Sequence, residues 1–167
     1  DRLHVGAGAV LQRIVTEAFD RGLSGLEFAV GIPGTVGGAV SMNAGTAERW
    51  IDSVVDEVVT FRPGEGLVRY AGADIAWFYR GSNIPPREII LEATFALTPG
   101  DERAVKLAME NMLARRKAAQ PLERPSCGSV FRNPPEQKAS HLVETCGLKG
   151  YTVGGAQVSE KHANFIV

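Results

Sequence analysis

A glycine-dense segment is the first feature of the sequence that could do chemistry. Gly31, Gly34 and Gly37 recur at a spacing of three residues. Such a chain adopts positive φ angles and lets backbone N–H groups approach a ligand without interference from Cβ, which suits a phosphate. The pattern is neither GxGxxG nor GxxxxGK[ST]. Phosphate binding and a structural turn region both remain open at this point.

An arginine beside aromatic residues is the second such feature. The segment Tyr79-Arg80-Gly81-Ser82 directly follows Trp77-Phe78. A guanidinium in apolar surroundings can hold a carboxylate or phosphate through two parallel hydrogen bonds. The alternative is a surface arginine whose aliphatic stem covers the neighbouring rings. The sequence leaves both interpretations open.

A thiol and a hydroxyl lie close together near the C-terminal end. Cys127 and Ser129 flank a glycine, and His162 and Asn164 lie downstream. A Cys-His hydrolase is therefore one hypothesis, since a thiolate nucleophile needs an imidazole nearby. A buried cysteine and a turn serine form the other. Ser129 does not lie in a GxSxG motif, so nothing supports a serine hydrolase.

The elements that must position these residues follow from hydrophobic spacing and turn residues. Apolar residues at helical spacing, and Pro63-Gly64-Glu65-Gly66 between two β-like runs, predict helices and a hairpin. Helices are expected over residues 9–21, 101–119 and 139–146, and strands over 54–61, 68–70, 88–97, 130–131, 153–158 and 163–167. Pro99-Gly100-Asp101 breaks the pattern, so a domain boundary is expected near residue 99.

Composition excludes several functional classes. The chain has 167 residues, 18 Lys+Arg against 19 Asp+Glu, and 44% hydrophobic residues, as a folded globular protein does. No apolar run is long enough to span a membrane, and no basic cluster suggests nucleic acid. Two cysteines and three scattered histidines show no metal-ligand spacing. We therefore expect a cytoplasmic protein with a small-molecule ligand and no metal.

Five motifs in fixed order cover essentially the whole chain. They are residues 25–39, 79–82, 120–121, 128–134, and 147–150 together with 158–167. In this order they resemble the UDP-N-acetylenolpyruvoylglucosamine reductases (UDP-N-acetylmuramate dehydrogenases), flavoenzymes of bacterial peptidoglycan precursor synthesis. The closing motif resembles the shorter subtype of that family.

The resemblance implies a fold and an activity. It implies an α+β fold, with part of the FAD-binding domain over residues 1–98 and a small α+β substrate-binding domain, truncated at its C-terminus, over residues 99–167. NADPH would reduce FAD, and hydride would then pass to UDP-N-acetylglucosamine-enolpyruvate to form UDP-N-acetylmuramate. This reaction belongs to cell wall biogenesis and hence to cell shape and division. The resemblance implies no obligate protein partner.

The resemblance also assigns roles by motif. Arg80 would lie at the reacting carboxylate, and Ser129 would donate the proton. Residues lining FAD would be Gly31, Ile32, Pro33, Gly34, Thr35, Gly37, Gly38, Asn43 and Gly45. Substrate-binding residues would be Tyr79, Arg116, Gln120, Asn133 and His162.

Two segments of the family have no counterpart in this sequence. The family begins with a further glycine-rich flavin-binding subdomain and ends beyond the last motif with a glutamate that assists protonation. The chain is therefore expected to be a fragment. A catalytically silent module that binds a nucleotide-sugar or a flavin is the alternative function.

Overall fold

The computed structural model describes residues 1–167, which form two compact units. Unit 1 is Asp1–Met112 and unit 2 is Leu113–Val167. The division falls inside helix α3 (Glu102–Ala119), one of the helices that the sequence predicted. The domain boundary expected near residue 99 stays a prediction. None of the helices combines the length and apolar character needed to cross a bilayer.

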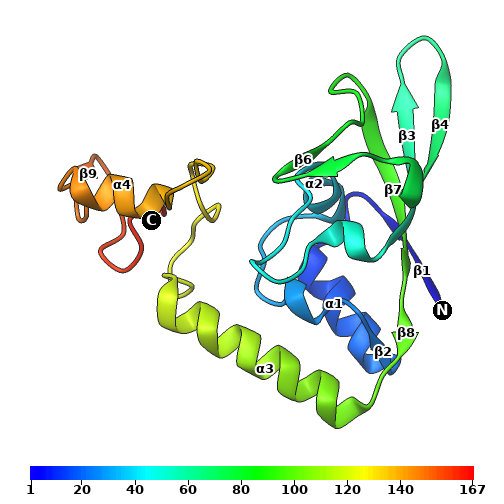
Figure 1. The fold of residues 1–167 in the computed structure, drawn as a ribbon, viewed down its shortest axis with the longest axis horizontal. Coiled ribbons are helices and arrows are strands. Elements are labelled where there is room, and N and C mark those ends of the chain that lie inside the picture. Colours follow the sequence, from blue (N-terminus) through cyan, green and yellow to red (C-terminus); the bar gives the residue numbers. More distant parts are fainter. The chain divides into compact units, whose positions relative to one another are not determined.

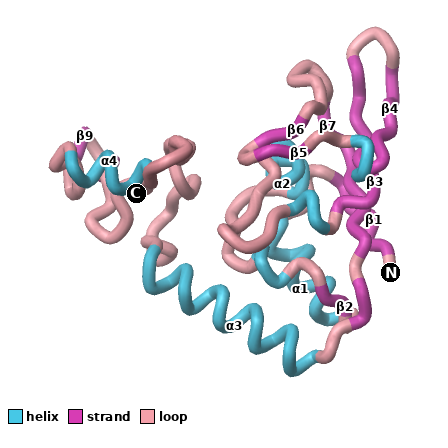
Figure 2. Tube along the Cα trace, in the orientation of Figure 1, coloured by secondary structure: helices cyan, strands magenta, loops and turns pink.

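A four-stranded antiparallel sheet organises unit 1 (Figures 1 and 2). Its strands are β1 (Arg2–Gly6), β7 (Ile89–Ala96), β3 (Val55–Arg62) and β4 (Gly66–Ala71), in that order. The predicted hairpin is confirmed, because β3 pairs with β4 up to Arg62 and Gly66. Strand β1 was not predicted. Only two of its side chains, Leu3 and Val5, are buried, which is too short an alternation to separate from a loop.

Two helices of unit 1 supply much of its core. Helix α1 (Leu11–Asp20) confirms the amphipathic pattern and buries Leu11, Val15 and Ala18. Helix α2 (Val36–Ser41) packs against β7 and β1. This short helix arises within the glycine-dense segment because Thr35 caps it: the amide of Gly38 donates to Thr35 Oγ1 at 3.3 Å.

Shorter elements connect these parts of unit 1. They are β2 (Leu23–Ser24), η1 (Glu27–Ala29), η2 (Ile51–Ser53), η3 (Gly72–Asp74), β5 (Trp77–Phe78), β6 (Gly81–Ser82) and β8 (Thr98–Pro99). Strands β2 and β8 pair with each other, as do β5 and β6.

Unit 2 has little regular structure after α3. It contains α4 (Ala139–Thr145), β9 (Thr152–Val153) and β10 (Ala156–Gln157). The three strands predicted here were wrong in extent. Residues 153–158 are split by a turn in which Gly154 has φ +59. Residues 163–167 form only the single bridges Ser129–Phe165 and Val158–Ile166, and residues 130–131 form no strand pairing. Mixed helices and strands nevertheless make the fold α+β, as predicted.

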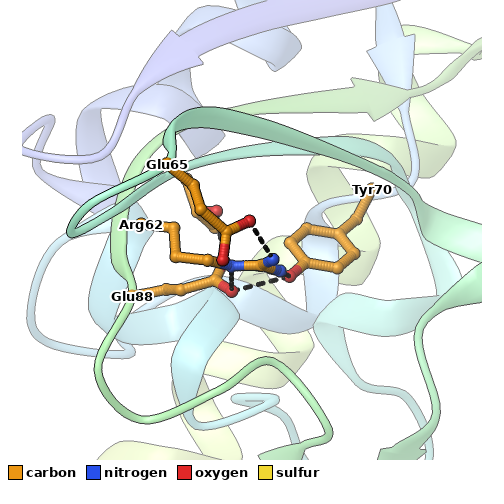
Figure 3. Close-up of polar contacts among 5 residues, drawn as sticks. Arg62, Glu65, Tyr70 and Glu88 are labelled. Atoms are coloured by element: carbon orange, nitrogen blue, oxygen red, sulfur yellow. Dashed lines mark hydrogen bonds and ion pairs between the residues drawn. The ribbon is translucent and has the colours of Figure 1, made fainter.

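A buried carboxylate just before β7 is hydrogen-bonded to strands β3 and β4 (Figure 3). The side chain of Glu88 is 1% exposed and accepts hydrogen bonds from Arg62 Nε at 2.7 Å, from Tyr70 at 2.9 Å and from Thr60. Burial raises the pKa of Glu88, but the hydrogen bonds from Thr60, Arg62 and Tyr70 together outweigh it and lower the pKa below its ordinary value.

Glu88→Gln is expected to lower the free energy of unfolding by about 2 kcal/mol at neutral pH, because charge-assisted hydrogen bonds are lost in a buried cluster. Since the folded-state pKa is depressed, this contribution is present above the unfolded carboxyl pKa and is lost as pH falls through the folded value. Urea denaturation as a function of pH measures it.

Glu65→Gln is the matched control. Glu65 also pairs with Arg62, but its side chain is 63% exposed, so a loss below about 1 kcal/mol is expected. Equal losses in the two variants would contradict a special role for the buried carboxylate.

Candidate functional site

Arg80 occupies a conformation that arginine rarely adopts. Phe78 pairs with Gly81 in the β5–β6 hairpin, so Tyr79 and Arg80 form its two-residue turn. Arg80 has φ +60 and Asn43 has φ +40, and these are the only two non-glycine residues at positive φ in residues 1–167. Such a conformation costs on the order of 1 kcal/mol and persists only where the surroundings impose it, often at functional sites.

The guanidinium of Arg80 is fixed by backbone carbonyls. Its Nη1 donates to Asn43 O at 3.4 Å and its Nη2 to Gly45 O at 3.2 Å. The guanidinium carbon lies 5.0 Å from the centre of the Tyr79 ring, which is itself 6.3 Å from the Trp50 ring. An arginine carries five N–H donors, so these two bonds leave donors with which to hold an anion. The structure thus joins Arg80 to two residues predicted at the flavin.

Asn43 is a buried structural link. Its side chain Nδ2 donates to Asp52 Oδ2 at 3.1 Å and to Phe78 O at 3.3 Å, and its Oδ1 accepts the amide of Asp52 at 3.1 Å. The residue is 1% exposed. Asn43 therefore connects its own loop to the strand that leads into Arg80, and its side chain bonds protein groups.

Gly45 lies where a larger residue has no room. A Cβ at this position would lie 2.5 Å from Arg49 O and 2.6 Å from Trp50 Cα, and would also clash with the Trp50 ring. The ring is anchored by its Nε1, which donates to Thr46 O at 2.5 Å. Close packing of Gly45 on Trp50 thus fixes the position of the Gly45 carbonyl, which accepts a hydrogen bond from Arg80.

Gly45→Ala is expected to destabilise the protein by about 1 to 3 kcal/mol, because backbone atoms, and not only a flexible side chain, must move. Thermal unfolding measures the change. Gly38→Ala is the control: its Cβ meets only Thr35 Oγ1 at 3.5 Å, and alanine favours a helix. If Gly45→Ala proved no more destabilising than Gly38→Ala, the packing argument would be wrong.

Two glycine-containing loops lie side by side where α1 and α2 begin. The amide of Leu11 donates to Gly34 O at 3.0 Å, and the amide of Gly37 donates to Ala7 O at 2.9 Å. A Cβ on Gly37 would lie 2.8 Å from Ala7 Cβ, so this approach requires glycine. A Cβ on Gly8 or Gly34 would meet only open space, and both glycines are exposed.

Several amides of the glycine-dense segment are already used within the protein. The amide of Gly31 donates to Gln12 Oε1 at 2.7 Å, and that of Gly38 donates to Thr35 Oγ1. These amides and that of Gly37 stabilise the loops themselves. Exposed Gly34 and Thr35 are therefore better placed to meet a ligand than the amides of Gly31, Gly37 and Gly38.

Ser129 is exposed and follows a glycine turn in unit 2. Gly128 has φ +83, and Ser129 forms a single antiparallel bridge with Phe165. The next two residues are bonded to Asn164, which is buried. The backbone around Ser129 is thus held by hydrogen bonds although the residue itself is exposed.

His162 lies on the same terminal segment. Its ring is 4.7 Å from that of Phe165, edge to face, and its Nδ1 accepts the amide of Asn164 at 3.3 Å. Burial lowers the pKa of His162 and so favours the neutral imidazole, and because Nδ1 accepts the amide of Asn164, the ring proton of that form lies on Nε2.

The other predicted substrate residues lie in both units. Tyr79 is in the β5–β6 turn of unit 1, and Arg116 is near the end of α3. Asn133 Oδ1 accepts the amide of Ala139 at 2.9 Å and so stabilises the start of α4. Gln120 Oε1 is buried without a hydrogen-bond partner.

The structure also identifies residues that sequence reasoning missed. Trp50 and Asp52 position Gly45 and Asn43, but the sequence gives no signal that links them to distant Arg80. Cys127 is exposed, so the expectation of a buried cysteine was wrong, because its loop contains no regular element to cover it. No hydrogen bond joins Cys127 to His162, so the structure adds no support to the hydrolase hypothesis.

Comparisons with known proteins relate both parts of the chain to flavoenzyme families. Residues 1–67 match the FAD binding domain family, and residues 120–167 match the family described as UDP-N-acetylenolpyruvoylglucosamine reductase, C-terminal domain. The resemblance that the motifs predicted is thereby confirmed.

Individual relatives extend this similarity over nearly the whole chain. UDP-N-acetylenolpyruvoylglucosamine reductase of Synechocystis is 44% identical over 98% of this chain, and that of Methylococcus capsulatus is 47% identical over 99%. The crystal structure of the Thermus caldophilus reductase covers 99% of the chain with a TM-score of 0.90 and 40% identity. The chain spans 53% and 54% of the two curated relatives and 61% of the crystallised one.

Proposed function

We propose that this chain provides flavin-binding and substrate-binding parts of a UDP-N-acetylenolpyruvoylglucosamine reductase. The reaction reduces UDP-N-acetylglucosamine-enolpyruvate with NADPH and a proton to UDP-N-acetylmuramate and NADP⁺, in the cytoplasm. The similarity over nearly all of the chain, at 44% and 47% identity, is the observation that carries the proposal. The fixed guanidinium of Arg80 and the exposed position of Ser129 are consistent with this proposal.

The residues of unit 1 fit FAD. A Cβ on Gly8 or Gly34 would meet no protein atom, so these two adjacent loops leave room for a ligand beside them. Gly34 and Thr35 would contact the cofactor on these loops. FAD, when bound, supplies the two-electron carrier that takes hydride from NADPH and delivers it to the alkene.

Arg80 would hold the substrate carboxylate and stabilise its developing charge. Hydride addition to the distal alkene carbon leaves negative charge on the neighbouring carbon and its carboxylate. A guanidinium already fixed by the carbonyls of Asn43 and Gly45 meets that charge with little reorganisation. The αL conformation of Arg80 directs the side chain at the cost of backbone strain.

Ser129 would donate the proton to the carbon next to the carboxylate. The enolate formed there is far more basic than an alkoxide, so a hydroxyl of ordinary pKa suffices as general acid if it lies within about 3 Å. Water would then return the proton to Ser129. His162, neutral with its proton on Nε2, would bind substrate by a hydrogen bond rather than by charge.

Two measurements test this function. Because the relatives are nearly twice as long, turnover is measured in the longest natural form of the protein. We expect a yellow protein with flavin absorbance between about 350 and 500 nm that oxidises NADPH in the presence of the enolpyruvyl substrate. Binding of FAD and UDP-sugar without turnover would favour a silent binding module, and binding of neither would refute both functions.

A further inference from the structure

Asn164 is a buried polar side chain of unit 2 whose oxygen and nitrogen are both hydrogen-bonded. It is 3% exposed, and its Oδ1 accepts the amide of Phe131 at 2.9 Å while its Nδ2 donates to Phe131 O at 2.8 Å. Its backbone carbonyl accepts the amide of Val130 at 2.9 Å. Asn164 therefore bonds the two residues that directly follow Ser129.

These hydrogen bonds have few other contacts to assist them. The side chains of Val130 and Phe131 are 50% and 59% exposed, so apolar burial does not hold this segment. The pairing of Ser129 with Phe165 is a single bridge, not part of a strand. On the other side of Ser129 lies Gly128 at positive φ, which adds freedom to the unfolded backbone.

We propose that Asn164 is a positioning residue that sets the place of the Ser129 hydroxyl during proton donation. This inference rests on the proposed function of Ser129. The side-chain amide of Asn164 bonds both the backbone N–H and the backbone C=O of Phe131, as a neighbouring β-strand would. These two bonds fix the backbone that follows Ser129. A displacement of about 1 Å at a reacting group can cost about 100-fold in rate.

The amide is chemically specific for this task. In Asn164→Asp the carboxylate still accepts from the Phe131 amide, but it places a second oxygen against Phe131 O and repels it. The other two contacts made by the backbone of residue 164, to Val130 and to His162 Nδ1, do not depend on its side chain. Asp is thus a near-isosteric probe of one hydrogen bond.

The experiment measures the two half-reactions separately in the longest natural form of the protein. Asn164→Asp is expected to leave flavin reduction by NADPH unchanged and to slow flavin reoxidation by the enolpyruvyl substrate about 30- to 100-fold. The solvent deuterium isotope effect on reoxidation should increase, because a misplaced donor makes proton transfer rate-limiting. In a Ser129→Ala background the Asn164 substitution should cause no further loss.

Ser159→Ala is the matched control. Ser159 is 4% exposed and its hydroxyl accepts the amides of Lys161 and His162, so its loss also removes a buried polar clamp from unit 2. It should leave the solvent isotope effect unchanged. An equal increase in this variant would reduce the role of Asn164 to general stability and overturn the proposal.

A readout independent of turnover keeps the proposal testable if Asn164→Asp folds poorly. In the 167-residue chain, Asn164→Ala should accelerate hydrogen exchange at the amides of Val130 and Phe131. Unchanged exchange, or losses that add in the double variant, would overturn it. If Ser129→Ala itself leaves reoxidation unchanged, the role of Ser129 in the proposed function fails instead.

Discussion

Ser129→Ala is expected to slow substrate reduction by about 100-fold or more while leaving the first half of the cycle intact. A positioned general acid contributes about 100- to 10,000-fold, so reoxidation of the reduced flavin by the enolpyruvyl substrate should slow within that range. Reduction by NADPH does not need this proton and should change less than about 2-fold. Stopped-flow absorbance of the flavin separates the two rates.

Ser126→Ala is the control for this prediction. Ser126 lies on the same loop, on the other side of Cys127 and Gly128, and has no role in the proposed chemistry. Its substitution should change neither half-reaction. Retained substrate reduction in Ser129→Ala, with Ser126→Ala unchanged, would remove Ser129 from the reaction.

Arg80→Ala is expected to cost about 3 to 4 kcal/mol of transition-state stabilisation, or about 100- to 1,000-fold in kcat/KM for the enolpyruvyl substrate. The loss should be in kcat more than in KM, because the guanidinium meets charge that develops during hydride addition. The hydrogen bonds from Arg80 to Asn43 and Gly45 are lost as well, so thermal unfolding must be measured alongside.

Two further variants show whether a loss of activity in Arg80→Ala comes from the guanidinium itself. Arg80→Lys keeps the positive charge but not the planar fork, and should recover only part of the rate. Arg87→Ala removes an exposed arginine that follows the same hairpin, and should have no effect on kcat/KM. A rate in Arg80→Ala equal to that in Arg87→Ala would exclude Arg80 from the site.

The fold was predictable where hydrophobic spacing was long and turn residues were present. Helix α1, helix α3 and the β3–β4 hairpin follow directly from such signals. Strand β1 was missed because it presents only two apolar side chains, and the terminal strands were overestimated because β-like residues there pair in single bridges. Pairing depends on partners distant in the sequence, which local patterns do not contain.

The candidate site was predictable as a set of residues but not as a set of contacts. The motifs named Arg80, Asn43 and Gly45, yet nothing in their spacing indicates that two carbonyls would hold one guanidinium. Likewise nothing in the sequence spacing indicates that Asn164 would be bonded next to Ser129. The two hydrogen bonds between the Asn164 side chain and Phe131 form only when segments 33 residues apart in the sequence meet.

The turn at Arg80 has an evolutionary consequence. Glycine and asparagine are the residues that its left-handed backbone favours, so random substitution there tends to relieve strain and raise stability. An arginine is retained at this left-handed position only if selection acts on its side chain, because stability alone would favour glycine or asparagine there. Thermostabilised variants obtained by screening for folding alone should therefore drift to glycine at this turn and lose activity.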